Sequence, residues 1–429
     1  MAEKIIRDPV HDVIAFRLDR AADSLLFNLL NCAEFQRLRR IRQLGMASLA
    51  YPGADHSRYS HSLGVMQTAR RILEQLCRSF YISEEDQTTC LVAALTHDLG
   101  HGPFSHVFER VSGVHHEDLT QQVLLDDESE VHRVLSDRDR ALPQRVADLL
   151  KCRPSRTYFC DILSSQLDAD RLDYLLRDNL MTGSQYGGYD LTWLLHAFTI
   201  DQKSNRLAVT WKGVSAVEAY LQSRFHMYRN VYFHKVVRSA EGMLKLSLQR
   251  AKRLAVQGRL TWPREESPVH KALLGRQLTM AEFRDLDDVS VQHCFKLWTT
   301  ADDPLLAGLC KGLLFRKLFK TIDLSRIEDA NVARLTVDAA ERAVKDAGGD
   351  PSYAMFLDEA SDAPYERMAG DSDGGHEILV LEPDGTLVEF AKVSPLAVSM
   401  DRQLMFRRLH VSPEYRDVTA RAVGKALGA

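Results

Sequence analysis

Apolar residues recur at helical spacing over most of the first 260 residues. Between Ser24 and Leu44 they follow this spacing until Gly45 stops the pattern, which predicts an amphipathic helix or a helix pair. The same spacing predicts further helices over residues 61–76, 83–100, 161–179 and 214–254. We therefore expect the first part of the chain to fold as a helical bundle.

The pattern changes towards the C-terminus. Helical stretches continue over residues 270–345, and residues 361–376 then lose periodicity and gather Gly, Asp and Ser, which predicts an exposed loop. Residues 377–390 (EILVLEPDGTLVEF) contain two β-prone runs around a Pro-Asp-Gly turn, which predicts a hairpin. The expected fold class is mainly α. A helical bundle would cover residues 1–265, and a helical and small mixed α/β lobe with the hairpin would cover residues 266–429.

Composition excludes several classes of protein. The net charge is −4, with 55 Lys and Arg against 59 Asp and Glu, which argues against a dedicated nucleic-acid binder. The segment MAEKIIRDPV lacks the apolar core of a signal peptide, and no stretch approaches the ~20 apolar residues that span a bilayer. We expect a cytoplasmic protein with no membrane partner. The seven cysteines include no C-x-x-C pair, which favours reduced thiols over disulfides or a thiolate zinc site.

A histidine-rich segment, LTHDLGHGPFSH at residues 95–106, is the first sign of chemistry. A hydrolytic metal site needs imidazole and carboxylate ligands that converge from several elements and leave one position open. A cation in such a site can lower the pKa of water and neutralise phosphate oxygens. The predicted helices offer four candidate ligands, His61, His97, Asp98 and Asp170. A second His-Asp pair, His11-Asp12, has no comparable cluster around it, and we expect it to be structural.

Three segments carry a family resemblance. RYSHSLGV (58–65), THDLGHGPFSH (96–106) and LDADRLDYLLRD (167–178) resemble the signatures of HD-domain phosphohydrolases, specifically the SAMHD-type and bacterial deoxynucleoside triphosphate triphosphohydrolases. The similarity continues through residues 5–14, 35–45, 51–61, 232–235 and 315–320. It implies that the four candidate ligands bind a divalent ion of iron, manganese, nickel, zinc or magnesium, and it allows a second divalent cation on the triphosphate. The implied products are a deoxynucleoside and inorganic triphosphate, and residues 1–265 would be the catalytic domain.

Two side-chain stripes are candidates for binding the substrate. Asp170, Tyr174 and Asp178 share one helix face, and Arg224, Tyr228, Tyr232 and Lys235 share another, although such stripes also occur on core or solvated faces. By the resemblance, Tyr174 packs against the deoxyribose, Asp178 and Gln43 hold the 3′-hydroxyl, Arg58, Arg171 and Arg224 clamp the phosphates, and Tyr232 stacks on the base. The implied substrate-binding residues are Gln43, Leu44, Arg58, Arg171, Tyr174, Asp178, Arg224 and Tyr232. Arg171 replaces a lysine of better-known members and Phe233 replaces a glutamine, so the base preference stays open.

The remaining histidines suit proton transfer. His106 precedes Glu109 by three positions and His116 directly precedes Glu117, and a carboxylate so placed can orient an imidazole and raise its pKa. The resemblance makes His106 and His116, with His101 and Glu109 in support, the groups that protonate the leaving 5′-oxygen or contact phosphate. We expect His115, His132, His196 and His226 to be structural or on the surface.

The resemblance also implies a homo-oligomer, a dimer or tetramer, whose interfaces bind an activating nucleotide. The corresponding positions here are Lys4, Ile5, Arg39, Arg316 and Lys320. Without the resemblance, basic residues in such amphipathic segments would be expected only to face solvent, with no bound nucleotide. Asn31 stands where some members place an acidic residue that recognises guanine, so the identity of an activator stays open.

Two alternatives remain beside the triphosphohydrolase. An HD-domain hydrolase could act on another nucleotide or a nucleic-acid end, and the released phosphate species would distinguish the two. A protein that senses nucleotides or binds single-stranded DNA or RNA with little turnover would instead show salt-sensitive binding without products.

Overall fold

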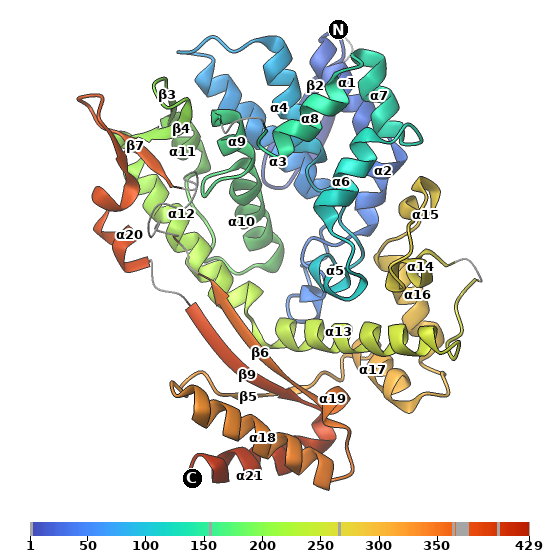
Figure 1. Ribbon diagram of the computed structural model, residues 1–429. Coiled ribbons are helices and arrows are strands. Elements are labelled where there is room, and N and C mark those ends of the chain that lie inside the picture. The colour runs from blue at the N-terminus through green and yellow to red at the C-terminus, as the bar shows by residue number, and fades with distance from the viewer. Residues whose placement is uncertain are drawn as a thin grey trace.

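Three helices, α3 (Arg58–Leu76), α4 (Glu84–Thr96) and α10 (Ala169–Thr182), lie at the centre of the N-terminal bundle in the computed structural model (Figure 1). α3 packs against both of the others and has buried residues on most of its surface. The structure describes residues 3–153, 157–264, 267–362, 365, 377–400 and 404–428. Since a helix covered on several sides is held rigidly, α3 is a firm base for side chains at its N-terminal end.

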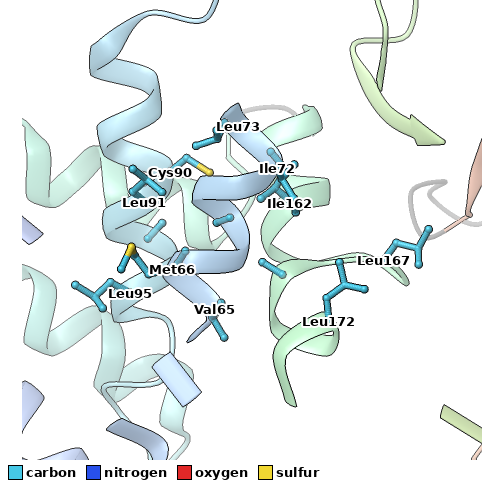
Figure 2. Packing of buried hydrophobic residues seen from close by; sticks show 14 of the residues in the cluster. Val65, Met66, Ile72, Leu73, Cys90, Leu91, Leu95, Ile162, Leu167 and Leu172 are labelled. Carbon is cyan, nitrogen blue, oxygen red and sulfur yellow. The ribbon is translucent and has the colours of Figure 1, made fainter. Parts of the chain in front are cut away.

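The core between these helices follows from the apolar spacing of the sequence. Figure 2 shows Val65, Met66 and Ile72 of α3 beside Cys90 and Leu91 of α4, all buried. The other elements of the bundle are β1 (Glu3–Asp8), β2 (Asp12–Arg17), α1 (Ala21–Leu30), α2 (Ala33–Arg37), α5 (His106–Ser112), α6 (His116–Leu125), α7 (Glu130–Arg138), α8 (Leu142–Leu150), α9 (Tyr158–Leu163) and α11 (Leu191–Ala197). The predicted bundle is therefore confirmed, and the first predicted helix is the pair α1 and α2.

Two predicted helices end or begin elsewhere than the pattern indicated. α4 has the predicted cap, because the Ser83 side chain accepts a hydrogen bond from the Asp86 backbone, but it ends at Thr96 and residues 97–100 form a tight turn. The helix predicted over 161–179 is interrupted, since Asp168 caps a new helix by accepting from the Arg171 backbone N–H at 2.7 Å. Asp170 therefore lies in the first turn of α10.

The long helix predicted over 214–254 is also divided. α12 (Val214–Met227) runs into a π-helical turn (Tyr228–Tyr232), and α13 (Lys235–Val256) then starts with His234 as its cap. Tyr228 and Tyr232 remain neighbours, with ring centroids 4.9 Å apart. Lys235 belongs to a different helix, so the predicted stripe does not extend to it.

A second core surrounds α13 and contains Phe295, Trp298 and Leu306. The helices that build it are α14 (Pro268–Leu273), α15 (Met280–Arg284), α16 (Asp288–Trp298) and α17 (Pro304–Leu314). The helical stretch predicted over 270–345 is thus present, although strand β5 (Lys320–Asp323) separates these helices from α18 (Ala330–Asp346).

The C-terminal lobe is a small mixed α/β unit, as predicted. Strand β9 (Leu404–Val411) lies between β5 and β6 (Met355–Asp362) and is antiparallel to both. Helices α18 and α21 (Arg416–Ala426) cover the sheet in Figure 1, and α19 (Pro351–Ala354) precedes β6. The loop predicted over 361–376 lies outside the described residues apart from Tyr365 and the end of β6.

The predicted hairpin is present as β7 (Leu379–Leu381) and β8 (Leu387–Glu389). β7 also pairs in parallel with β4 (Arg206–Thr210), which gives a sheet in the order β3-β4-β7-β8 with β3 (Phe198–Asp201). Together with α20 (Pro395–Met400), the hairpin packs against the N-terminal bundle. Local sequence signals predicted the turn and not this distant pairing.

The cysteines form no disulfide within the described residues, and Cys32, Cys90, Cys160, Cys294 and Cys310 are buried, which agrees with the prediction of reduced thiols. Within the described residues, no helix is both long enough and apolar enough to cross a bilayer.

Candidate metal centre and cavity

The predicted metal ligands come together from three elements. His61 lies in the first turn of α3, His97 and Asp98 follow the end of α4, and Asp170 is the second residue of α10. Asp170 Oδ1 lies 2.9 Å from His61 Nε2 and 3.8 Å from His97 Nε2. Asp98 Oδ1 lies 3.3 Å from His97 Nε2. Two imidazoles and two carboxylates therefore surround one point.

The hydrogen bonds of the two imidazoles leave their Nε2 atoms facing this point. His97 Nδ1 donates to the Ala94 carbonyl at 2.9 Å, and His61 Nδ1 donates to Asp173 Oδ2 at 2.9 Å. His97 Nε2 is buried and has no hydrogen-bond partner among the described residues. Such a nitrogen is costly to bury unless it binds something. The donor set thus fits a divalent cation, and two imidazoles with two carboxylates suit iron, manganese, nickel, zinc or magnesium to differing degrees.

Electrostatics favour a cation at this point. Burial would lower the pKa of His61, but its hydrogen bonds with Asp170 and Asp173 outweigh burial and raise the pKa to about 10. Burial would raise the pKa of Asp98, but the Arg58 guanidinium outweighs it and holds that pKa well below its usual range. The hydrogen bonds of His61 and His97 likewise outweigh burial and lower the pKa of Asp170. Both carboxylates are therefore ionised at neutral pH, which is the form that binds metal ions, and a metal ion would displace the proton of His61.

A cluster of histidines adjoins the metal constellation. His101 Nε2 lies 3.2 Å from Asp98 Oδ1, and the rings of His101 and His116 are stacked at 4.0 Å between centroids. His106 completes the cluster, with its ring 5.4 Å from each of the other two. The predicted proton-transfer residues thus lie next to the predicted ligands.

The Glu109 carboxylate orients three imidazoles, those of His106, His115 and His116. Its Oε2 accepts from His116 Nδ1 at 3.1 Å and from His106 Nδ1 at 3.3 Å, and its Oε1 accepts from His115 Nδ1 at 3.0 Å. The sequence pointed to Glu117 as the partner of His116, which is wrong because α6 turns the ring towards Glu109. His115, which received no role, shares the same carboxylate.

The expected rise in the pKa of His106 is also wrong. Burial and the nearby Arg58 lower the pKa of His106, and they lower the pKa of His101 to about 3. Burial would raise the pKa of Glu109, but its histidine partners outweigh it and bring the pKa to about 2. His101 is therefore neutral at pH 7, and Glu109 is ionised.

A cavity of about 780 Å³ opens over the metal constellation and the histidine cluster. It continues past α6 to the turn formed by Lys151, Cys152 and Arg153. The predicted residues that line it are Gln43, Arg58, His97, Asp98, His101, His106, His116, Asp170 and Tyr174. Gln43 Oε1 is buried without a hydrogen-bond partner among the described residues, so it is available to a ligand. The lining of the cavity therefore contains candidate metal ligands, histidines that could transfer protons, and polar groups.

Other predicted substrate residues surround the cavity without lining it. Asp178 accepts from Tyr232 at 2.8 Å, and its other oxygen lies 2.7 Å from His56 Nε2. His56 is a residue that the sequence analysis missed. Within the described part of the chain, the predicted substrate-binding residues outside the lining are Leu44, Arg171, Asp178, Arg224 and Tyr232, and the predicted site residues His61 and Glu109 lie outside it as well.

The two arginines of this group lie close to Tyr174. Arg171 donates to Asp168 and to the Ser165 carbonyl, and the Arg224 guanidinium lies 5.1 Å from the centroid of the Tyr228 ring. Burial raises the pKa of Tyr174 well above its usual range, and both guanidinium groups oppose this rise. Tyr174 therefore lines the cavity and lies within electrostatic range of both positive charges.

The loop that carries His101 is held by residues without a motif signal. Phe104 and Ser105 have φ angles of 50° and 51°, a strained conformation for such residues. Asp288 of α16 accepts from the Phe104 backbone N–H at 2.7 Å and from the Arg42 backbone N–H at 3.0 Å. The buried Arg37 donates to the carbonyls of residues 99, 101 and 286. These contacts fix the loop, and their partners are distant in sequence.

The predicted activator residues lie on exposed segments. Lys4 and Ile5 are exposed on β1, and Lys320 is exposed at the start of β5. The Arg39 guanidinium lies 3.6 Å from the Tyr59 ring centroid, and Arg316 Nε donates to the carbonyl of residue 49 at 2.8 Å. No hydrogen bond or ion pair joins any two of the five in the part of the chain that the structure describes.

The fold and the site define a helical protein whose clustered histidines and aspartates could hold a metal ion. The family model for the HD domain matches residues 58–156, and the model for the HD associated region matches residues 189–259. The Bacillus subtilis protein YwfO is 37% identical over 402 residues, which cover 93% of this chain and 89% of that protein. The chain therefore belongs to the HD-domain phosphohydrolase family.

Two further comparisons agree with this family membership. A crystal structure of a phosphohydrolase from Bacteroides thetaiotaomicron superposes with a TM-score of 0.79 at 27% identity and covers 96% of this chain and 100% of that chain. A relative named deoxynucleoside triphosphate triphosphohydrolase SAMHD1 homolog, from Dictyostelium discoideum, is 29% identical over 66% of this chain and 56% of that protein.

Proposed function

We propose that this protein hydrolyses deoxynucleoside triphosphates to a deoxynucleoside and inorganic triphosphate. The observation that carries the proposal is a cavity lined by three of the predicted ligands, His97, Asp98 and Asp170, together with Arg58, Tyr174 and the histidine cluster. The fourth, His61, lies directly behind this lining, with Nε2 2.9 Å from Asp170 Oδ1. The name of the Dictyostelium relative supports this substrate class. A divalent cation bound by His61, His97, Asp98 and Asp170 would polarise the phosphate and make a nucleophile of water near neutral pH.

The chain's own groups would bind and protonate the substrate. Arg58 reaches Asp98 and Ser105 from α3 and lines the cavity, so its guanidinium can also bind phosphate oxygens. Water attacks the α-phosphorus, and the bond from this phosphorus to the 5′-oxygen breaks. The departing oxygen takes a proton from Nε2 of the His116 imidazolium, whose Nδ1 N–H donates to Glu109. The proton that the attacking water loses then restores the imidazolium. His101, neutral at pH 7, serves as a hydrogen-bonding group.

Recognition of deoxyribose would depend on Tyr174, Gln43 and Asp178. The free Gln43 Oε1 can accept from a 3′-hydroxyl. Tyr174 lines the cavity beside the metal centre, with its ring 6.4 Å from the His61 ring, so its bulk can exclude a 2′-hydroxyl. Hydrogen bonds with His56 and Tyr232 hold the Asp178 carboxylate, and the Tyr232 ring lies 6.2 Å from the Tyr174 ring. A polar site of this kind rejects analogues that leave its groups unpaired.

The test is to incubate the purified protein with Mn²⁺ or Mg²⁺ and each dNTP, singly and mixed, and to separate the products by anion exchange. We expect deoxynucleoside and triphosphate in equal amounts, and none from the double variant His97→Ala, Asp98→Ala with unchanged helicity. Release of single phosphate or of a monophosphate would identify another phosphate ester as the substrate. Full activity in the double variant would refute the metal assignment.

We also propose that an activating nucleotide binds between copies of the chain, at Lys4, Ile5, Arg39, Arg316 and Lys320. The exposure of Lys4, Ile5 and Lys320 supports this proposal. Activity that requires a mixture of dNTPs, together with a nucleotide-dependent rise in molecular mass, is the expected result. Equal activity with each dNTP alone and a constant mass would refute it.

A further inference from the structure

A buried chain of hydrogen bonds connects the N-terminal hairpin to His61. His11 Nε2 lies 2.8 Å from Asp173 Oδ1, and His61 Nδ1 lies 2.9 Å from Asp173 Oδ2. The side chains of His11, His61 and Asp173 are each at most 1% exposed. His11 follows β1, while Asp173 lies one turn beyond Asp170 on α10. The Asp173 carboxylate thus accepts hydrogen bonds from two imidazoles, and one of these, His61, is a predicted metal ligand.

A buried arginine holds the same carboxylate. Arg177 donates to Asp173 through Nε at 2.8 Å and through Nη2 at 2.9 Å. It also donates to Asp8 of β1, at 2.8 Å and 3.2 Å. Each oxygen of Asp173 therefore has one imidazole partner and one guanidinium partner. Charged groups are expensive to bury, and such a complete network fixes the position of its members.

The backbone makes room for this network at Gly64. A Cβ atom at this position of α3 would lie 1.9 Å from Asp173 Oδ1 and 2.3 Å from Arg177 Nη2. Only glycine allows α3 and α10 to approach so closely. The approach brings Asp173 within hydrogen-bond distance of His61, which lies one turn earlier on α3.

We propose that His11 is a positioning residue of the metal centre. Acting through Asp173, it fixes the ring orientation and the tautomer of His61, so that His61 Nε2 faces Asp170. The inference rests on the proposed role of His61 as a ligand. The other nitrogen of His11 is buried and has no hydrogen-bond partner among the described residues, so the ring makes its one hydrogen bond to Asp173. Partners of this kind typically contribute about 10–100-fold to metal affinity.

The neighbouring residue supplies a matched control. Asp12 directly follows His11, is 84% exposed and pairs with Arg7 at 2.8 Å. Its φ of 60° is one that asparagine also adopts readily. Asp12→Asn therefore changes the charge of the hairpin and leaves the buried chain intact, whereas His11→Ala removes one donor to Asp173. His11→Gln retains an N–H donor on a side chain of similar reach.

The experiment measures Co²⁺ binding to the metal-free full chain by calorimetry and by the visible absorption spectrum of the bound ion. We expect His11→Ala to weaken binding about 10–100-fold and to change the spectrum. His11→Gln should recover most of the affinity, and Asp12→Asn should match the unmodified protein. Thermal unfolding of each metal-free variant reports loss of fold separately from loss of metal.

The outcomes separate the two claims, because none of these measurements needs a substrate. Wild-type affinity and spectrum in His11→Ala, with binding lost in His61→Ala, would overturn the positioning role alone. Wild-type affinity in His61→Ala would overturn the ligand assignment and the inference with it. If His11→Ala does not fold, a folded His11→Gln variant with binding as weak as that of His61→Ala would overturn the inference, because the amide should restore the donor.

Discussion

The N-terminal bundle and the C-terminal lobe differ in where their buried charged groups lie relative to the candidate site. Around His61, the bundle encloses Asp173 and Arg177 with no exposed surface, in one connected network. The lobe encloses a small apolar core in which Leu409 and Val411 of β9 pack against α18 and α21. Apolar burial stabilises a fold without directional demands, whereas buried charges are costly unless each has its partners. The lobe also buries His410 and Asp358, but neither lines the cavity, whereas the buried network of the bundle lies directly against the candidate metal centre.

The largest expected effect comes from the predicted ligand Asp170. Asp170→Ala should reduce hydrolysis about 1,000-fold or more, because several kcal/mol of charge stabilisation by the metal would be lost. Leu409→Ala, in the lobe, should lower the free energy of unfolding by about 2–5 kcal/mol and leave the rate of the folded protein unchanged. Steady-state kinetics and urea unfolding of both variants test the contrast. A large loss of rate in a folded Leu409→Ala protein would contradict it.

Arg37 should affect both stability and activity. Arg37→Ala would leave three buried carbonyls without their donor, including that of His101, and should destabilise the protein by about 3–5 kcal/mol. Activity should also fall, because the loop that carries His101 loses its support. Arg78→Ala, at an exposed position, is the control. Equal unfolding free energies for the two variants would argue against this role.

His410 should make the lobe sensitive to acid. Burial lowers the pKa of His410 to about 4, although Asp358 opposes it, so the folded protein keeps this ring neutral. The unfolded chain takes up a proton below about pH 6.5, so stability should fall by about 3 kcal/mol as pH drops from 6.5 to 4. Urea unfolding across this range should show a smaller loss in His410→Gln. The same loss in both proteins would refute this assignment.

Asp288 should affect the pH dependence of stability in the opposite direction from His410. Burial raises the pKa of Asp288 to about 6, although the hydrogen bonds that it accepts from two backbone N–H groups act to lower this pKa. The folded protein binds this proton more tightly than the unfolded chain, so stability falls by up to about 3 kcal/mol as pH rises from 4 to 6. Asp288→Asn should remove this dependence of the unfolding free energy on pH. A change in the unfolding free energy that is the same at every pH does not affect the test. Unfolding curves at several pH values would reveal the loss of this dependence, and an unchanged slope would contradict the prediction.

The smallest effect concerns the cap of α4. Ser83→Ala removes the hydrogen bond to the Asp86 backbone at 3.1 Å and should cost about 1 kcal/mol. The metal centre lies at the other end of this helix, so turnover should not change. Thermal unfolding measures the cost, and Thr88→Ala, at a half-buried position of the same helix, provides a reference.

The sequence by itself determined the bundle and the metal constellation. Helical spacing located α3 and α4 because the apolar face of a helix repeats locally, and the HD signatures singled out His61, His97, Asp98 and Asp170. The structure brings these four side chains together. The break before α10 also had a local signal, since Asp168 is a strong capping residue.

Tertiary structure alone decided the support of the site. His11 meets Asp173 across 162 positions, and Asp288 meets Phe104 across 184. No local periodicity encodes such pairs, because they depend on how helices approach one another in space. The low pKa of His106 arises in the same way, since burial and Arg58 act together on a ring that the sequence places beside Glu109. Local spacing thus determines which groups are present, and packing between distant segments determines their partners and charge states.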